Sequence, residues 1–369
     1  MSELQKLDSY LSEAGPAALV LRDQLAPVEG VGGVFFPPTF AAAEDAKKFP
    51  GGYNIDGEGA GSVCLVDSVG SQANRIEPLF AKDEYRDLVP QVVVKAGEHD
   101  INMLDAGHRA GDALVRCSAL QEELQAAFKA LLKGDASLLA KVAPTSLVFG
   151  VWDSRDTQAK APRLLASTIR AFNVRRLTRS AQFNPATEFV NNGMLDEPAD
   201  TATKKAYAER GFIHVPASGS HGGVIADGGI RRDATLSLAA LRLISVGKDA
   251  AATLALRRYI LGLALVAFTS NVSGYLRQGC NLVLDAESPQ PRRIEEVHPD
   301  GRRVPFAITH EAALNYAREA AKAFGVGASR NVEFDKERAK KDIAGDPKKN
   351  EAKAAKKAEA AAAKKSKAG

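Results

Sequence analysis

The chain has 369 residues, of which 45% are hydrophobic and 25% are charged, and its formal net charge is +4. This is enough apolar sequence for a sizeable core, in one large domain or two intertwined domains. Cys64, Cys117 and Cys280 lie far apart without a C-x-x-C pair, which argues against a disulfide framework or a zinc site. The cysteines are therefore expected to be buried thiols of a protein from a reducing compartment.

The positive charge is concentrated at the C-terminus. Residues 335–369 hold 12 Lys and Arg against 6 Asp and Glu, so residues 1–334 carry about −2 (+4 − 6). Only local clusters of basic residues can therefore indicate a polyanionic ligand of the body. We divide the chain into a domain over 1–334 and a low-complexity Lys/Ala-rich tail over 335–369. The tail is predicted to be disordered or a solvated helix, and both polyanion binding and a solubility role remain open for it.

The N-terminal half alternates strand and helix signals. The first residues carry charges where a signal peptide needs an apolar core, so we expect a cytoplasmic protein. The predicted elements are a short helix at 4–12, a strand at 18–22, a strand ending near Val66, a helical stretch at 105–133 interrupted near Cys117, a strand at 146–154, and a helix from Pro162 to Phe172.

The C-terminal half starts with the Gly-rich segment Phe212–Ile230, whose "FIHV" and "GGVIA" are predicted to pair as a hairpin. A mostly buried helix follows at 249–268, with an apolar run too short for a membrane span. Residues 292–306 are predicted to form two strands joined by a Pro-Asp-Gly turn. Thr309 is expected to cap a helix that ends at Gly325, with Leu314, Ala317, Ala321 and Phe324 on one face. This irregular order predicts an α+β fold with long insertions.

Common catalytic and nucleotide-binding motifs do not match the sequence. Gly247-Lys248 continues with Asp249 and lacks the earlier glycine of a P-loop, and "GEGAGS" (57–62) does not fit G-x-G-x-x-G. "SGSHGG" (218–223) lacks the first glycine of a nucleophile elbow. His99 has no ligand partner at helical spacing, so a surface or core role is favoured over a metal role. We expect no metal and no cofactor.

The stretch "SVGSQANRIEP" (68–78) places Ser71, Gln72, Asn74 and Arg75 where a strand ends. These side chains reach phosphate oxygens, sugar hydroxyls and base edges, and none is a good general base. A structural use is equally open, with Ser71 and Asn74 capping a turn and Arg75 pairing with Glu77.

The segment 155–179 is the strongest local signal. It contains one acid, Asp156, and these basic residues: Arg155, Lys160, Arg163, Arg170, Arg175, Arg176 and Arg179. On the helix predicted for 162–172, Arg163, Ser167 and Arg170 fall opposite the apolar side chains. Like charges at this spacing repel one another, so phosphate binding is favoured over pairing with acids elsewhere in the body.

The motifs "LVDSVGSQANRIEP" and "VFGVWDSRDTQAKAPRLLASTIRA" resemble the backbone subunit of type I-U (I-G) CRISPR effector complexes, a RAMP-superfamily relative of the Cascade backbone subunit. The likeness extends over roughly residues 15–325. It implies an RRM-like (ferredoxin-like) palm with insertions, and a β-hairpin thumb that wedges between nucleotides. Phe212–Ile230 is the thumb candidate and Arg292–Phe306 its rival. Copies of the subunit would line up along one CRISPR RNA and support target DNA recognition in antiviral defence, together with other Cascade subunits.

The resemblance also assigns roles to residues. It implies that Arg155, Lys160, Arg163 and Arg170 contact guide phosphates, and that Ser71, Gln72, Asn74 and Arg75 contact the RNA backbone or 2′-hydroxyls. Trp152 is expected to pack in the core, because it lies within an apolar run.

The resemblance implies a non-catalytic subunit. The alternative is a metal-independent RAMP-type endoribonuclease acting on CRISPR RNA, with His108 or His221 as the acid-base residue and an arginine that stabilises charge. A scaffold whose basic residues pair internally is a third interpretation.

Overall fold

The computed structural model describes residues 4–271 and 274–344. Its centre is an antiparallel sheet in the order β16-β15-β1-β13-β10-β5-β4, with β14 paired to the end of β1. The strands are β1 (Ala18–Pro27), β4 (Ile55–Asp56), β5 (Val63–Asp67), β10 (Leu165–Phe172), β13 (Ile230–Ser237), β14 (Leu282–Leu284), β15 (Arg292–Val297) and β16 (Arg303–Pro305).

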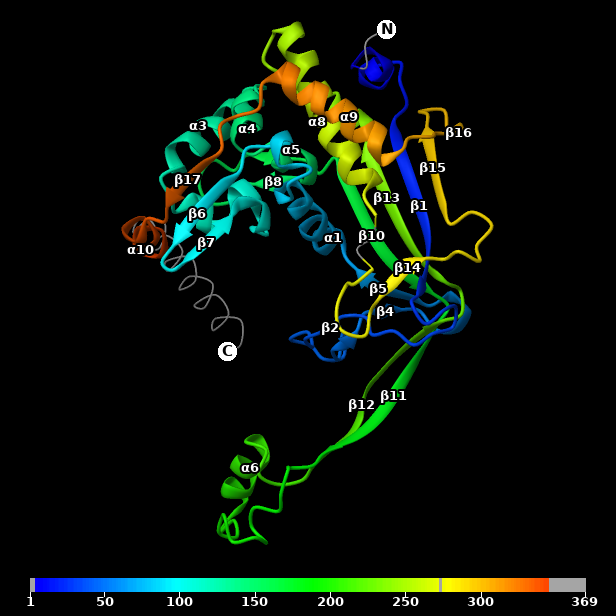
Figure 1. Ribbon diagram of the computed structural model, residues 1–369, viewed down its shortest axis with the longest axis vertical. Helices are drawn as coiled ribbons and strands as arrows, with labels where there is room; N and C mark the ends of the chain where they lie inside the picture. Colours follow the sequence, from blue (N-terminus) through cyan, green and yellow to red (C-terminus); the bar gives the residue numbers. More distant parts are fainter. Residues whose placement is uncertain (1–3, 272–273, 345–369) are drawn as a thin grey trace, which may run out of the picture.

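Helices cover one face of this sheet (Figure 1). They are α1 (Val69–Ile76), α5 (Thr145–Phe149), α7 (Leu238–Leu241), α8 (Ala250–Thr269) and α9 (His310–Phe324). Successive strand residues point to opposite faces, so Leu19, Leu21 and Leu25 of β1 enter the core while Arg22 between them is exposed. Side chains on the opposite face of the sheet are mostly exposed or half-buried.

Helix α8 is the main core helix. By length and composition alone it would pass as a membrane span, yet 61% of its most apolar window is buried inside the protein. Asp249 caps its N-terminus by accepting a hydrogen bond from the Ala252 amide. α8 therefore serves as the layer between the sheet and α9 (Figure 1).

A helical lobe flanks the sheet on one side (Figure 1). It contains α2 (Ala113–Arg116), α3 (Gln121–Leu132), α4 (Ser137–Val142) and a small sheet of β6 (Val92–Ala96), β7 (His99–Asn102) and β17 (Arg330–Glu333). The 3-10 helices are η1 (Leu4–Leu11), η2 (Gly59–Gly61), η3 (Glu77–Ala81), η4 (Arg86–Leu88), η5 (Met103–Asp105) and η6 (Arg109–Gly111). Helix α10 (Lys336–Ala344) buries no residue and is tied to the body by the Arg116–Asp342 ion pair at 2.5 Å. Residues 345–369 of the predicted tail lie outside the described residues.

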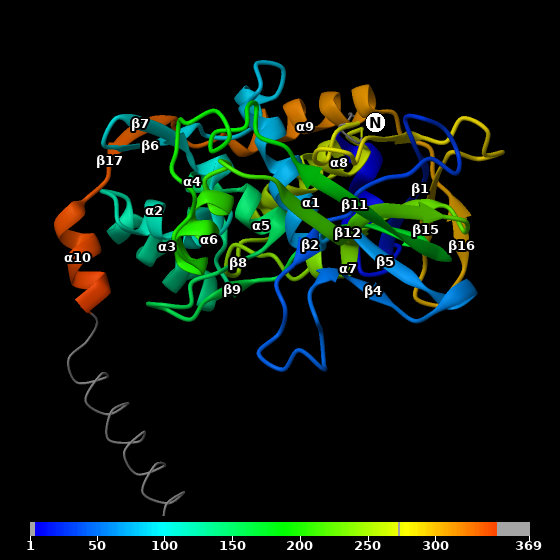
Figure 2. The same ribbon diagram turned by 90° about the horizontal axis from the view of Figure 1, so that it is seen from below.

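A long two-stranded arm projects from the end of the sheet (Figures 1 and 2). We define the arm as residues 174–226, with β11 (Val174–Phe183) paired to β12 (Val215–Ala226) and α6 (Thr201–Glu209) near its tip. At its base, the Tyr53 hydroxyl accepts a hydrogen bond from the Gly223 amide at 3.0 Å. Gly223 has a φ of +99°, and a Cβ there would lie 2.5 Å from Val34. Only glycine fits this junction.

Short hairpins complete the fold: β2 (Thr39–Phe40) with β3 (Gly52–Tyr53), and β8 (Val151–Trp152) with β9 (Lys160–Ala161).

Several sequence predictions are confirmed. β1 begins at Ala18, and helical turns occupy 103–132 with a break after Arg116. Residues 292–306 form the β15–β16 hairpin. Thr309 caps α9, which ends at Gly325 with a φ of +73°. The cysteines are buried and unpaired.

Three predictions are wrong. Residues 165–172 form strand β10, not a helix, because pairing with β13 and β5 on both sides outweighs an apolar spacing that suits either structure. The strand predicted at 146–154 is largely helix α5, and only Val151–Trp152 is extended. "FIHV" and "GGVIA" do not pair with each other, because Val215 and the "GGVIA" residues lie on one strand, β12, whose partner is β11.

Candidate nucleic-acid interface

The polar cluster of α1 surrounds a buried carboxylate. Asp67, at the end of β5, has no exposed surface. Its Oδ1 accepts from Ser71 Oγ at 2.7 Å, and its Oδ2 accepts from Gln72 Nε2 at 2.7 Å and Arg75 Nε at 3.1 Å. Arg277 Nη2 donates to Oδ1 at 3.0 Å. Ser71, Gln72 and Arg75 therefore stabilise a buried charge that would otherwise be very costly.

Asn74 is itself exposed and contacts a second cluster, formed by the buried Arg109 and Glu77. Its Oδ1 accepts a hydrogen bond from Arg109 Nη2 at 3.1 Å, and Arg109 Nε lies 2.5 Å from Glu77 Oε2. Burial raises the pKa of Glu77 to about 7, against the opposing effect of the Arg109 charge. The partner of Glu77 is thus Arg109 and not Arg75, and the N-cap of α1 is Ser68 and not Ser71.

Arg163 and Arg170 do not form the expected helical stripe. Arg163 Nε donates to the Phe149 carbonyl at 2.8 Å, and burial together with the charge of Arg109 lowers its pKa. Ser167 is buried and donates to Gln72 Oε1 at 2.9 Å. Arg170 is exposed on the opposite face of β10, so the strand separates residues that a helix would have aligned.

Arg155 and Lys160 lie on the β8–β9 hairpin and are both exposed. The expectation that Trp152 packs in the core is wrong, because 53% of this residue is exposed. The Lys160 ammonium lies over its ring, 4.3 Å from the centroid. Trp152 is exposed because it alternates with the buried Val151 and Asp153 along an edge hairpin.

The uncovered side of the central sheet carries a set of arginines, and we call this side the open face. Strand register and alternation place these charged residues on it: Arg22 of β1, Arg170 of β10, Arg231 and Asp233 of β13, Arg293 and Glu295 of β15, and Arg303 of β16. Arg22, Arg293 and Arg303 have 44%, 46% and 51% of their side chains exposed. Five arginines thus share the face with two carboxylates.

Arginines lie directly opposite one another across neighbouring strands of the open face. Arg22 is the register partner of Arg293, and Arg170 is the register partner of Arg231. Asp233 accepts from both Arg22 at 3.1 Å and Arg231 at 2.8 Å. Like charges at directly opposite positions destabilise a sheet. The face therefore has an excess of positive charge that its own carboxylates do not neutralise.

Sequence reasoning identified Arg170 but missed the other arginines of the open face. A partial signal was available in "IRRDATLS", where Arg231, Asp233 and Thr235 alternate with Ile230, Arg232 and Ala234, whereas "ALVLRDQL" begins with four apolar residues and shows no such alternation. Recognising the common face requires the strand register, which brings together residues more than 200 positions apart in the chain, such as Arg22 and Asp233.

The first strand of the arm, β11, carries three arginines, and the second, β12, carries no Lys or Arg. Arg175 forms a two-point ion pair with Asp227, at 2.6 and 3.0 Å, while Arg176 is exposed. The tip is held by its own aromatic cluster, in which Phe212 contacts Phe189 and Tyr207. Of the two thumb candidates, Phe212–Ile230 supplies one strand of this projecting arm, whereas β15–β16 lies at the edge of the central sheet (Figure 1).

The two histidines of the alternative function are both exposed. His108 has 87% of its side chain exposed, and its Nδ1 lies 3.4 Å from Asp112. His221 lies on the arm, with its ring against Tyr53 at 4.8 Å between centroids. Within residues 4–271 and 274–344, no group of three or more His, Cys, Asp or Glu side chains is arranged to hold a metal ion.

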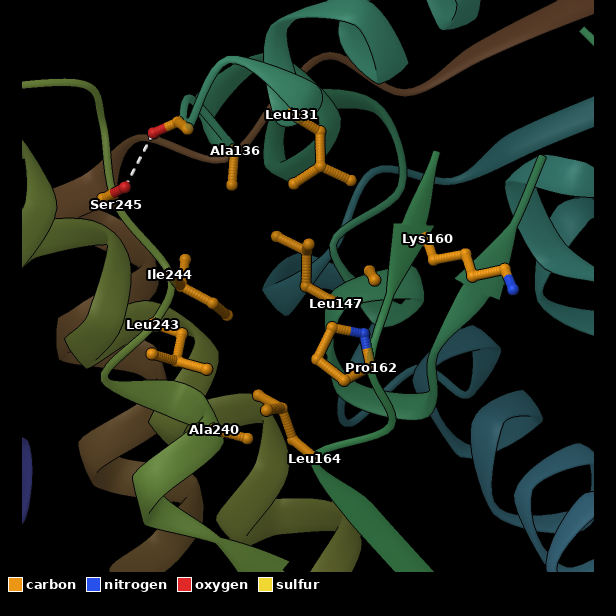
Figure 3. A pocket seen from close by; sticks show the side chains of 12 residues that line it. Leu131, Ala136, Leu147, Lys160, Pro162, Leu164, Ala240, Leu243, Ile244 and Ser245 are labelled. Atoms are coloured by element: carbon orange, nitrogen blue, oxygen red, sulfur yellow. Dashed lines mark hydrogen bonds between the residues drawn. The ribbon is translucent and has the colours of Figure 1, made fainter. Parts of the chain in front are cut away.

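Two cavities differ in chemistry. One of about 170 Å³ is lined mainly by apolar side chains, including Leu131, Leu147 and Leu243, and Figure 3 shows the Lys160 side chain pointing away from it. Another of about 180 Å³ is lined by apolar side chains such as Leu79 and also by charged and polar ones, which include Gln72, Arg75, Lys82 and Arg232. Arg75 and Arg232 already pair with Asp67 and Asp23. Neither cavity presents a nucleophile next to a base.

Comparison with known proteins adds one match to a family. Residues 19–176, which include β1, β5, α1 and β10, match the family described as "CRISPR-associated protein GSU0053". None of the curated proteins matches the chain.

A similar solved chain belongs to a "CRISPR RNA-guided surveillance complex". The alignment covers 84% of this chain and 89% of the other at 12% identity, with a TM-score of 0.27. So distant a likeness carries no argument about fold or function. The family match thus supports a relationship to CRISPR-associated proteins over residues 19–176, which is less than half of the chain.

Proposed function

We propose that this protein is a non-catalytic RNA-binding backbone subunit of a CRISPR effector complex of the type I-U (I-G) Cascade kind. The observation that carries the proposal is the open face, where Arg22 opposes Arg293 and Arg170 opposes Arg231. A polyanion bound there offsets the repulsion that the ion pairs of Asp233 and Glu295 compensate only in part.

The open face suits RNA of any sequence. Arginines bind phosphates through charge and hydrogen bonds, which requires no base identity. An antiparallel sheet with helices on one face is also the arrangement in which an RRM exposes its other face to RNA. In this proposal the sheet is an RRM-like palm, and base pairing between guide and target DNA supplies specificity.

The arm is the proposed thumb. It extends beyond the body (Figure 1), carries Arg175 and Arg176 on its first strand and has a cluster of half-buried aromatic rings at its tip. Such a projection can reach nucleotides or a neighbouring subunit that the sheet cannot. Further copies of the chain, other Cascade subunits and target DNA are the proposed partners, in the cytoplasm.

The test is whether the protein, expressed together with its guide, copurifies with RNA of defined length. We expect its affinity for unrelated RNA to fall steeply with salt, because phosphate contacts release counterions. Arg170→Glu with Arg303→Glu should flatten this salt slope. Arg86→Glu, on η4 away from the open face, is the matched control. A wild-type slope near zero would instead favour a scaffold whose basic residues pair internally.

The same preparation distinguishes the nuclease alternative. The proposed non-catalytic role predicts that repeat RNA remains intact in the absence of metal ions, although His108 lies beside Asp112 and the ring of His221 contacts that of Tyr53. Specific cleavage that His108→Ala or His221→Ala abolishes would replace the proposed function with the endoribonuclease.

A further inference from the structure

We infer that the β8–β9 hairpin is a base-stacking platform for single-stranded RNA, with the Trp152 indole as the stacking surface. The inference rests on the proposed function and names a further contact within it. The first observation is the exposure of the indole. Tryptophan is usually largely buried, yet 53% of Trp152, the only tryptophan in the chain, is exposed to solvent.

The hairpin is fixed to the body on one side. Three of its side chains are buried: Val151, Ala159 and Ala161. Its backbone also packs closely on Gly111, because a Cβ added to that glycine would lie only 2.9 Å from the Trp152 carbonyl oxygen. The alternation of the two strands therefore directs Trp152 and its cross-strand partner Lys160 outward together. The platform is attached to the core through its backbone and its buried neighbours.

The turn of the hairpin is held in one conformation. The buried Asp153 carboxylate accepts from the Thr157 amide at 2.8 Å and from the Thr157 hydroxyl at 2.6 Å. Gln158 has a φ of +61°, and its side chain donates to the Ser154 carbonyl. A turn closed by its own hydrogen bonds loses little entropy when a ligand binds to it.

The charges beside the indole favour a polyanion over a protein partner. Lys160 lies over the ring and Arg155 projects from the turn, and neither has an acidic partner among the described residues. The turn also contains two acids, Asp153 and Asp156. Asp153 is buried and bonded to Thr157, Asp156 accepts from Gln121 at 2.8 Å, and neither pairs with a cation of the hairpin. Aromatic rings flanked by cations bind single strands by stacking bases and pairing phosphates.

The hairpin is connected to the central sheet through the chain. Residues 162–164 join β9 directly to β10, which carries Arg170 on the open face. One base would stack on Trp152, and Lys160 and Arg155 would contact the adjacent phosphates.

The experiment uses the single tryptophan as its own reporter. The wild-type chain is titrated with an oligouridylate of roughly 30 nucleotides. Tryptophan emission measures stacking, and the anisotropy of a dye on the same RNA measures binding independently. We expect emission to be quenched in step with the anisotropy change.

Variants give the second readout, by anisotropy. Trp152→Ala should lose roughly 5- to 150-fold in affinity, which corresponds to the about 1–3 kcal/mol of one base–aromatic stack. Trp152→Phe should recover part of this loss, and Lys160→Ala should reduce the salt slope by about one. Leu243→Ala, which removes another exposed apolar side chain, should bind like the wild type.

Two results would overturn the platform and leave the proposed function intact. In the first, the wild type binds RNA by anisotropy while its tryptophan emission stays unchanged. In the second, Trp152→Ala binds RNA with the full affinity of the wild type. The same holds if Trp152→Ala alters only the oligomeric state, since the indole would then be a protein contact. No anisotropy change in the wild type would overturn both together.

Discussion

Asp67 is fully buried and forms ion pairs with two guanidinium groups, those of Arg75 and Arg277. Removing one member of a buried ion cluster leaves the others charged and unpaired. Asp67→Ala is therefore expected to lower the free energy of unfolding by about 3–5 kcal/mol. Urea unfolding followed by circular dichroism measures this.

Asp300→Ala is the control for Asp67. Asp300 lies in an exposed turn, where it accepts a hydrogen bond from the Arg302 amide at 2.9 Å, and its loss should destabilise the protein far less than the loss of Asp67. An equally small effect at Asp67 would mean that Arg75 and Arg277 can turn to solvent. In that case the α1 cluster would be available for RNA contact, as the sequence alone suggested.

His310 makes the junction of α8 and α9 sensitive to pH. Its ring contacts Thr269 Oγ1 at 2.8 Å and Tyr85 Oη at 2.9 Å, and burial lowers its pKa. Below about pH 6.5 the unfolded chain binds a proton that the folded site disfavours, so stability falls as pH decreases.

We expect the stability advantage of the wild type over His310→Gln to shrink between about pH 7.5 and 5.5. Comparing the two proteins at each pH removes the contributions of other titrating groups, such as Glu77. An advantage that stays constant with pH would show that the pKa of His310 is the same in the folded and unfolded states.

Strand β10 links the stability of the sheet to its proposed use. Arg170 lies opposite Arg231, so Arg170→Glu replaces a repulsive cross-strand pair with an attractive one. We expect the variant to gain about 0.2–1 kcal/mol in unfolding free energy and yet bind RNA more weakly. Thermal unfolding and RNA titration of the same sample test both parts. Loss of stability together with binding would indicate a structural role for Arg170.

The same strand shows how far the sequence predicts the structure. Elements with strong local signals, such as the Asp249-capped α8 and the Thr309-capped α9, are predictable because caps and apolar spacing act within one segment. β10 is not, because Leu164, Leu165, Ile169 and Phe172 fit both a helix and a strand. Long-range pairing with β5 and β13 decides between them.

For the candidate site, the sequence indicated which polar residues act together but not which groups they contact. Ser71, Gln72 and Arg75 were recognised as a group, and the structure shows that their common partner is Asp67, which precedes them in the same motif. The arginines of the open face were missed, since they come from strands spread between Arg22 and Arg303. Only a sheet register assembles such a surface.

At the level of the whole molecule, the arm tip is separable from the body. Phe183 is the register partner of Val215, so residues 184–214 can be replaced by a two-residue Asn-Gly turn. Neither hydrophobic core includes a residue from 184–214. We therefore expect the free energy of unfolding to change by less than about 0.5 kcal/mol.

Under the proposed function, the shortened protein should assemble less well on RNA. Sizing the complexes by analytical ultracentrifugation with and without the tip measures this. A large loss of stability would mean that the tip contributes to the folding of the body. Unchanged assembly would remove the tip from the proposed thumb.

The buried thiols have a consequence for chemical labelling. Burial raises the pKa of Cys64 to about 12 and that of Cys280 to about 11, and it also raises the pKa of Cys117. Since the thiolate is the nucleophile, all native cysteines should resist alkylation while the protein is folded. A cysteine placed at the exposed Met194 would then be the sole reactive thiol, and a fluorophore there would report the motion of the arm.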